Sequence, residues 1–335
     1  PAMSSRKRVL SGIQPSGTIH IGNYFGAVEN WVRLTADYDC FFAIVDLHAI
    51  TVAYEPALLQ KRIWDAALDN MAAGLDPGKC TIFVQSHVPE HTELCWLLTC
   101  VTPLGELGRM TQFKEKSERE RENVTAGLLS YPILQAADIL LYRADAVPVG
   151  EDQAQHLEFT REVARRFNGR FGDHFPEPAT LIGRGARVMG LDGGSKMSKS
   201  AGNHIGVVED PASIWEKLRP AKTDEARKRR SDPGDPARCN IFSYHKLVTP
   251  QAELDGIAAG CTGASIGCLD CKKAFHGNLM KVLDPIRERR LALEREPERV
   301  REALREGARR ARAVARETLD GAKERMGLLD RKGTF

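Results

Sequence analysis

Short apolar runs alternate with longer helical patterns through the first half of this chain. The apolar runs cover residues 9–13, 40–45, 81–85 and 144–149. Helical patterns cover 57–74 and 153–167. Such alternation is typical of parallel strands joined by helical crossovers, with helices on both faces of the sheet. We therefore expect an α/β fold with a Rossmann-like, doubly wound parallel sheet, whose ligands lie beyond the carboxyl ends of the strands.

The strand pattern disappears from about residue 202, and helices broken by Gly and Pro take its place. We place a domain boundary near Ser200, with an α/β domain over 1–200 and an all-helical domain over 201–297. Apolar residues at helical spacing predict an amphipathic C-terminal helix within 298–335. We interpret its many arginines as partners of glutamates four residues away, with an RNA-binding stripe as the alternative.

Composition limits the class of protein further. The chain has 335 residues, of which 42% are hydrophobic and 28% charged, enough for about two domains with sizeable cores. No apolar run approaches the ~18 residues of a membrane span, and no signal peptide precedes the first strand. We therefore expect a cytoplasmic protein without a membrane partner. Because the net charge is only +3, a nucleic acid would have to be bound by local basic patches. The absence of a GxGxxG pattern argues against a dehydrogenase.

Two short phosphate-binding patterns lie about half a chain apart. The first, Thr18-Ile19-His20-Ile21-Gly22-Asn23-Tyr24, follows a Gln14-Pro15-Ser16-Gly17 turn and starts a helix, whose free N–H groups favour phosphate. The second, Lys196-Met197-Ser198-Lys199-Ser200, places two ammonium groups in a glycine-flanked loop that can close on a triphosphate. Alone, each pattern is equally compatible with a turn or a solvated loop. Together they predict one nucleotide site.

In this order and at this separation, the two patterns resemble the HIGH and KMSKS signatures of class I aminoacyl-tRNA synthetases, with Asn23 in place of the usual final His. Further blocks are similar to those of bacterial-type tryptophanyl-tRNA synthetases: Gly12 to Gly17, Ile44 to Thr51, Arg109 to Lys114, Tyr131 to Leu140 and Val147 to Gln153. The resemblance extends from Val9 to Ser200 and continues more weakly to the C-terminus.

The resemblance implies a tryptophan–tRNA ligase. Such an enzyme forms tryptophanyl-adenylate from L-tryptophan and ATP, releases pyrophosphate, and transfers tryptophan to tRNA(Trp). It also implies that the helical domain over 201–297 recognises the anticodon, and that a homodimer forms through a segment of about 74–138 inserted between the two halves of the sheet. A charged block within that segment, Lys114 to Asn123, is expected to be a loop or a solvated helix end.

The resemblance also implies an ATP site. His20 and Asn23 would hold phosphates, while Lys196 and Lys199 would stabilise the transition state and the leaving pyrophosphate. Because the tryptophan carboxylate is already an anion, the first step needs no general base, and positioning and charge stabilisation supply the catalysis. The other implied ATP-binding residues are Gln14, Ser16, Gly17, Gly22, Gly150, Glu151, Asp152, Met197 and Ser198. Mg²⁺ is expected on the phosphates without a cage of protein carboxylates.

Asp138 is the most informative residue of the expected tryptophan pocket. A carboxylate within the apolar run Ala136 to Leu140 is costly to bury unless a donor meets it. An indole N–H is such a donor, and phenylalanine lacks it. The residues alone favour a helix-internal Asp that caps the helix or pairs with Arg, whereas the resemblance favours the ligand role. The other implied pocket residues are Tyr131 and Gln153 at the ammonium group, His48 at the carboxylate, Val147 and Val149 at the indole, and Leu10 and Gln135, which replace a common aromatic and a common Met.

The eight cysteines form two groups. Four lie in apolar surroundings and are interpreted as core thiols: Cys40, Cys80, Cys95 and Cys100. The other four are spaced C-x21-C-x6-C-x2-C in the second domain: Cys239, Cys261, Cys268 and Cys271. Four thiolates on a loop-rich cytoplasmic segment suit Zn²⁺ or a [4Fe–4S] cluster. A subset of tryptophanyl-tRNA synthetases has nearly the same spacing, with one more residue in the first gap, and binds [4Fe–4S] beside its anticodon-reading surface, so the resemblance favours the cluster.

Two basic runs near these cysteines, Arg227 to Arg230 and Lys272-Lys273, are candidates for contact with RNA phosphates, with solvated charge as the alternative. Two other classes of function also stay open. A nucleotidyltransferase of related fold would act without tRNA and would not need a helical domain with four cysteines. A non-catalytic paralogue would be expected to have damaged motifs, whereas both motifs are intact.

Overall fold

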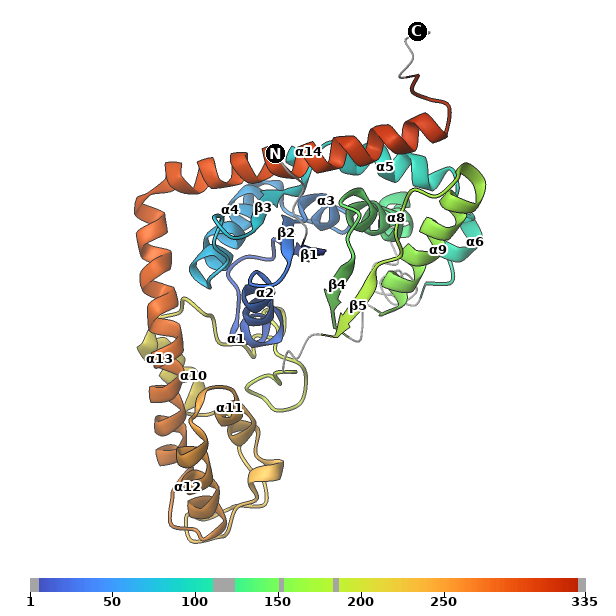
Figure 1. Cartoon of the computed structure of the whole chain (residues 1–335). Coiled ribbons are helices and arrows are strands. Elements are labelled where there is room, and N and C mark those ends of the chain that lie inside the picture. Colours follow the sequence, from blue (N-terminus) through green and yellow to red (C-terminus); the bar gives the residue numbers. More distant parts are fainter. Residues whose placement is uncertain (1–5, 111–123, 151–153, 183–186, 331–335) are drawn as a thin grey trace.

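The computed structural model describes residues 6–110, 124–150, 154–182 and 187–330 (Figure 1). Within these residues a parallel sheet has the strand order β3-β2-β1-β4-β5. Its strands are β1 (Arg8–Ile13), β2 (Asp39–Ile44), β3 (Thr81–Val84), β4 (Ala146–Val149) and β5 (Ala179–Ile182). The α/β class and the four expected strand regions are confirmed. Sequence reasoning missed β5, because this short strand directly follows the turn-forming residues Pro176 and Pro178.

The strand order reverses between β1 and β4. From β1 the chain adds β2 and β3 on one side, and it then returns to add β4 and β5 on the other. Loops that follow two such neighbouring strands turn in opposite directions and leave a crevice at their carboxyl ends. The backbone topology therefore fixes where a ligand can enter this sheet, before any side chain is considered.

Helices cover both faces of the sheet. In the first part of the chain they are α1 (Ile21–Asn23), the π-helix η1 (Tyr24–Val28), α2 (Glu29–Leu34), α3 (Asp46–Ala49), α4 (Pro56–Ala72), the 3₁₀-helix η2 (Gln85–His87), α5 (Glu90–Thr99), α6 (Leu104–Leu107), α8 (Ala126–Leu141) and α9 (Ala154–Phe171). The first three of these follow one another without a break. Helix α8 is mostly apolar, and its buried face belongs to one core with residues of β1, β2 and α9.

The rest of the described chain is helical, as expected. Its elements are α10 (Pro211–Leu218), the 3₁₀-helix η4 (Pro236–Arg238), α11 (Asn240–Val248), α12 (Gln251–Thr262), α13 (Cys268–Arg295) and α14 (Pro297–Arg325). In Figure 1, α10 to α12 lie at one end of the molecule, α13 runs from them toward the sheet, and α14 turns sharply to cross over it. Among the described residues, no helix is long and apolar enough to span a membrane.

Helix α14 confirms the expected amphipathic C-terminal helix. Its buried residues Val300, Leu304, Ala311 and Leu319 recur at helical spacing and pack on the sheet side. Most of its exposed arginines pair with a glutamate three residues before them, as Arg309 does with Glu306 at 2.7 Å. The expected spacing of four was therefore mostly wrong, while the interpretation as intrahelical ion pairs was right.

The interpretation of the first four cysteines was partly wrong. Cys40 and Cys80 are buried and Cys95 is half-buried, whereas Cys100 is exposed. Cys100 is the residue at which α5 ends, so its apolar sequence neighbours face the core while its own side chain faces outward.

Gly307 allows α14 to lie directly against β3. A Cβ atom at this glycine would come 1.8 Å from the carbonyl oxygen of Ile82, a backbone atom that cannot turn away. Gly307→Ala should therefore destabilise the protein by about 1–3 kcal/mol, measured by chemical unfolding. Gly256 in α12 is the matched control, because nothing lies within 4 Å of a Cβ there. Gly256→Ala should stabilise by up to ~1 kcal/mol. Equal effects at both glycines would contradict the close packing.

Candidate active site

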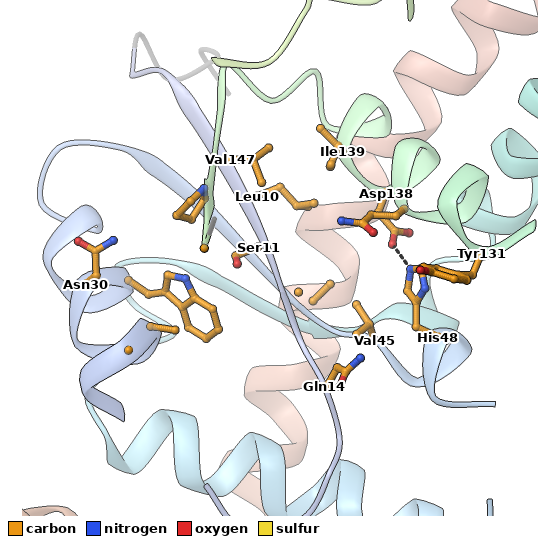
Figure 2. Close-up of a pocket in the computed structure, with 18 of the residues that line it drawn as sticks. Leu10, Ser11, Gln14, Asn30, Val45, His48, Tyr131, Asp138, Ile139 and Val147 are labelled. Atoms are coloured by element: carbon orange, nitrogen blue, oxygen red, sulfur yellow. Dashed lines mark hydrogen bonds and ion pairs between the residues drawn. The ribbon is translucent and has the colours of Figure 1, made fainter. Parts of the chain in front are cut away.

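A cavity of about 430 Å³ opens at the reversal point between β1 and β4 (Figure 2). Its volume suits a small organic ligand. The expected ligand-binding residues that line it are Leu10, Gln14, His48, Tyr131, Gln135, Asp138, Val147 and Gly150. The structure therefore brings together residues of β1, α3, α8 and β4, and of the segments after β1 and β4, that the sequence had grouped. Sequence reasoning missed further lining residues, including Ser11, Asn30, Trp31, Val45, Thr51 and Ile139.

Asp138 faces this cavity from α8 and is only 3% exposed. Three described side chains donate to its carboxylate. Its Oδ1 accepts from Gln85 Nε2 at 2.7 Å and from His91 Nδ1 at 2.6 Å, and its Oδ2 accepts from His48 Nε2 at 2.8 Å (Figure 2). A carboxylate has about four acceptor positions, so Oδ2 keeps capacity for one more donor. The partners are two histidines and an amide, not the arginine that the sequence allowed as an alternative.

These partners keep Asp138 ionised. Burial pushes the pKa of Asp138 upward, but the hydrogen bonds and positive charge of His48 and His91 outweigh burial and lower this pKa to about 2. A buried anion is stable only when several donors satisfy it. The site therefore presents a fixed, negatively charged acceptor at one end of the cavity.

The donors to Asp138 follow the carboxyl ends of neighbouring strands. His48 lies on α3, directly after β2, whereas Gln85 begins η2 directly after β3. His91 lies on α5 and is completely buried, with its Nε2 2.8 Å from the Tyr142 hydroxyl. Sequence reasoning missed Gln85 and His91, although polar residues directly after a buried parallel strand are a signal for such a site.

Two other expected pocket residues also have protein partners. The Tyr131 hydroxyl lies 2.9 Å from His156 Nε2, and both residues are buried. His48, expected beside a substrate carboxylate, lines the cavity while its Nε2 is bonded to Asp138. Both rings are therefore held in one orientation before any ligand enters.

His20 and Asn23 form a reciprocal cap at the start of α1. His20 Nδ1 accepts from the Asn23 backbone N–H at 3.3 Å, and Asn23 Oδ1 accepts from the His20 backbone N–H at 3.1 Å. Burial, and then the charges of Lys199, His204 and Lys196, lower the pKa of His20 to about 4. His20 is therefore neutral near pH 7. Because Nδ1 accepts, the ring proton is on Nε2, which is free to donate.

Lys199 joins the two phosphate-binding patterns. Its Nζ donates to the Ser16 carbonyl at 2.8 Å, in the turn before His20. Burial lowers the pKa of Lys199, with the positive charge of Arg62 acting in the same direction. Lys196 is exposed, Met197 is buried, and the Ser198 N–H donates to Asn203 Oδ1 at 2.8 Å.

Two positions in and before the first pattern require glycine, Gly17 and Gly22. Gly17 adopts a φ of +89°, which disfavours other residues, and its Cα faces Lys199 Nζ. A Cβ atom at Gly22 would come 2.9 Å from the His20 ring. Glu151, Asp152 and Gln153, the side chain of Val149 and the whole charged block, 114–123, lie outside the described residues.

The four clustered cysteines lie where α11, α12 and α13 meet. Cys239 directly precedes α11, Cys261 lies near the end of α12, and Cys268 and Cys271 lie in the first turn of α13. All four are half-buried. Burial, and then the neighbouring thiols of the other three, raise the pKa of Cys271 to about 12. Over the described ranges, no group of three or more His, Cys, Asp or Glu residues has the geometry to hold a metal ion.

One candidate RNA contact beside these cysteines was wrong. Lys272 is buried, and its Nζ donates to the carbonyl oxygens of Arg219 at 2.8 Å and Ala221 at 2.6 Å. Lys273, the following residue, is exposed. Alternation of burial along the first turns of α13 separates these two lysines, which the sequence treats as one basic run.

The chain is similar to known proteins over most of its length. A family model described as tRNA synthetases class I (W and Y) matches residues 3–284. A tryptophan–tRNA ligase of Deinococcus radiodurans is 54% identical, with 96% of this chain and 99% of the relative covered. The tryptophan–tRNA ligase of Caldanaerobacter subterraneus subsp. tengcongensis is 49% identical, with 96% of this chain and 99% of the relative covered. Tryptophanyl-tRNA synthetase of Campylobacter jejuni, solved with ADP and tryptophan, is similar at a TM-score of 0.88 and 34% identity, covering 96% of this chain and 100% of that one.

The lowered pKa of His20 has a testable consequence. In NMR spectra of histidine-labelled protein, the His20 ring should titrate near pH 4 rather than near its usual 6.5, with the signal assigned by its loss in His20→Asn. Because the unfolded chain binds this proton first, acidification from pH 6.5 toward pH 4 should weaken the folded state. His20→Asn should flatten that dependence. A His20 titration above pH 6 would show that its ring is solvated and accessible.

Proposed function

The chain belongs to the class I tRNA synthetases of the tryptophan and tyrosine group, and we propose that it is a bacterial-type tryptophan–tRNA ligase. The enzyme activates L-tryptophan with ATP to tryptophanyl-adenylate and pyrophosphate, and then transfers tryptophan to tRNA(Trp). The observation that carries this proposal is the ionised Asp138, whose remaining acceptor capacity faces a cavity at the reversal point of the sheet. Relatives named tryptophan–tRNA ligase support the same substrate.

Tryptophan binds with its indole N–H donating to Asp138. The apolar side chains of Leu10, Val147 and Val149 enclose the ring, and Gln135 adds a polar group to the same wall. Tyr131 and Gln153 hold the ammonium group, and His48 lies beside the carboxylate while it orients Asp138. Phenylalanine would fill the cavity but leave the buried acceptor unpaired, which is a strong basis for discrimination.

ATP binds where the two phosphate-binding patterns meet. His20 donates from Nε2 to phosphate, and Asn23 fixes the start of the helix whose N–H groups face the same charge. Lys196 and Lys199 stabilise charge on the reacting phosphate and on pyrophosphate. Further contacts come from the turn before the helix, the end of β4 and the lysine loop: Gln14, Ser16, Gly17, Gly22, Gly150, Glu151, Asp152, Met197 and Ser198.

Activation is an in-line displacement on phosphorus. The tryptophan carboxylate oxygen bonds to the α-phosphorus as the bond to the bridging oxygen of pyrophosphate breaks. A ribose hydroxyl at the 3′ end of tRNA then attacks the adenylate carbonyl, and AMP leaves. Mg²⁺ enters bound to the ATP phosphates. Since no proton moves in the first step, catalysis depends on positioning and on the lysine charges.

Other parts of the molecule serve RNA binding and assembly. The helical domain over 201–297 recognises the anticodon of tRNA(Trp), and the enzyme acts in the cytoplasm. A homodimer forms through the segment of about 74–138. Trp96 and Leu104 in this segment support the dimer, because they are 67% and 71% exposed. Large apolar side chains exposed to this extent are typical of interaction surfaces.

The four clustered cysteines hold a [4Fe–4S] cluster, with Zn²⁺ as the alternative. The donor set fits, because four half-buried thiols from three helix ends approach one another closely enough to raise the pKa of Cys271. A bound cation would reverse that effect and favour thiolates. Zn²⁺ would be held by four sulfurs at about 2.3 Å from one ion. A cluster of four irons spans a wider set of ligands.

Pyrophosphate exchange tests the function. Exchange should depend on tryptophan among the twenty amino acids. Lys199→Ala should lower the rate of adenylate formation about 10²-fold while tryptophan affinity changes little, because its charge acts on the transition state. Lys273→Ala, the same change at an exposed lysine of α13, should leave the rate of exchange unchanged. An unchanged rate with a raised KM in Lys199→Ala would remove Lys199 from the chemistry.

Asp138 should set the preference for tryptophan. Asp138→Ala should reduce discrimination against phenylalanine by at least ~1 kcal/mol of transition-state binding, measured as the ratio of the two kcat/KM values. Gln135→Met is the control, because it changes the same cavity wall without touching the buried acceptor. If Asp138→Ala keeps the wild-type ratio, Asp138 is a structural residue.

The cluster has its own signature. Anaerobically purified protein should be brown, with broad absorption near about 400 nm and about four irons per chain, whereas zinc would give colourless protein with about one metal. Cys268→Ser should weaken tRNA charging much more than pyrophosphate exchange, because the site shapes the helical domain. Cys100→Ser, at an exposed cysteine outside this group, should change neither. Full tRNA charging by metal-free protein would show that charging does not require a metal bound by the four cysteines.

A further inference from the structure

Arg290 of α13 is buried against two aspartates of α4. Its Nε donates to Asp69 Oδ1 at 2.6 Å, and its Nη2 donates to Asp65 Oδ1 at 3.0 Å. The arginine is only 6% exposed, and Asp69 is completely buried. Arg290 also pairs with Glu294 at the edge of this group, and Lys61 pairs with Asp65. Buried charges of this kind persist only when each is matched in place.

The second carboxylate oxygen of Asp69 contacts the nucleotide loop, the segment of residues 14–20 that precedes α1. Asp69 Oδ2 accepts from the backbone N–H of Ile19 at 2.8 Å, in a buried contact across 50 residues of sequence. Ile19 directly precedes His20. The carbonyl of Ile19 accepts from Val207 N–H at 2.9 Å, so the peptide groups on both sides of this residue are held. A buried bond to an ionised acceptor is stronger than one between neutral groups.

Asp69 also acts on Lys199 by charge. Burial lowers the pKa of Lys199, and the negative charges of Asp69 and, less strongly, Asp65 oppose that effect. One buried carboxylate therefore holds the backbone next to His20 and helps keep the lysine of the second pattern protonated. Asp65 lies one helical turn away and shares Arg290, but it has no bond to the nucleotide loop among the described contacts.

We propose that Asp69, fixed by Arg290, is a positioning residue for the ATP site of this enzyme. The inference rests on the proposed roles of His20 and Lys199 at the ATP phosphates. Because the arginine belongs to α13, whose first turn carries Cys268 and Cys271, the geometry of the nucleotide loop depends on how this long helix is seated on α4. The packing of the sheet alone does not determine the geometry of this loop.

Three variants of the full chain test this role: Asp69→Ala, Asp69→Asn and Asp65→Ala. Calorimetry measures ATP binding, and also tryptophan affinity in the absence of ATP. Tryptophan-dependent exchange gives kcat and the KM for ATP, and thermal unfolding gives stability. Asp69→Ala should weaken ATP binding about tenfold or more while tryptophan affinity stays within about twofold. Asp69→Asn keeps an acceptor for the Ile19 N–H but loses the charge and the bond to Arg290, so its ATP affinity should fall between those of wild type and Asp69→Ala.

Asp65→Ala is the matched control. It also removes one partner of Arg290 but leaves the buried Ile19 N–H bonded, so its loss of thermal stability should be smaller than that of Asp69→Ala, and ATP affinity should stay within about twofold of wild type. Unchanged ATP affinity in folded Asp69→Ala, or equal losses of ATP affinity in the two alanine variants, would overturn the proposal. Parallel losses of ATP and tryptophan affinity would do the same, since they indicate a general structural defect.

Arg290→Lys decides the question if Asp69→Ala does not fold. Lysine keeps the charge but cannot bond Asp69 and Asp65 together, so an ATP-specific loss is expected, and normal ATP affinity would overturn the proposal. Calorimetric ATP binding does not depend on the amino acid. A wild-type protein that binds ATP but does not respond to tryptophan would therefore refute the proposed function and still allow Asp69 to be judged.

Discussion

A buried carboxylate joins the elements that build this site. Asp138 on α8 accepts from His48 on α3, Gln85 on η2 and His91 on α5. Each donor follows a different strand or helix end, so these elements must be correctly placed relative to one another before all three hydrogen bonds to Asp138 can form. The energetic asymmetry of such groups is large, because a buried ion that loses one donor costs more than the bond itself contributes. The arrangement of these elements around the cavity therefore depends on the ionised Asp138 carboxylate.

The nucleotide end of the site depends on backbone contacts instead. Short helix α1 is capped by His20, the residue before it, together with its last residue Asn23, and Lys199 bonds the Ser16 carbonyl from the other half of the chain. Positions 19 to 21 also share backbone hydrogen bonds with residues 205 and 207. The two phosphate-binding patterns are therefore one structural unit, although more than 170 residues separate them in sequence.

Local patterns were sufficient to predict much of this architecture. Alternating apolar runs predicted β1 to β4, and helical spacing predicted α14, because burial on one face imposes a period on the sequence. β5 was missed because four residues after two prolines carry too little pattern. Gln85 and His91 were missed for another reason. Their role depends on partners that only the sheet order brings together, so no local period marks them. The pairing of Asp69 with Arg290 is likewise invisible in sequence, since 221 positions separate them.

In the proposed function, Asp138 and the two phosphate-binding patterns supply opposite charges that give this site its direction. Asp138 is an anion at the indole end, whereas Lys199 and Lys196 are cations beside a neutral His20 at the phosphate end. A neutral His20 can donate to phosphate without adding a proton that must later be removed. In the proposed binding mode, tryptophan brings an N–H donor to Asp138 and a carboxylate to the ATP phosphates, so these charges favour a single orientation. Since the reaction needs no general base, this orientation is itself the larger part of what the protein must provide.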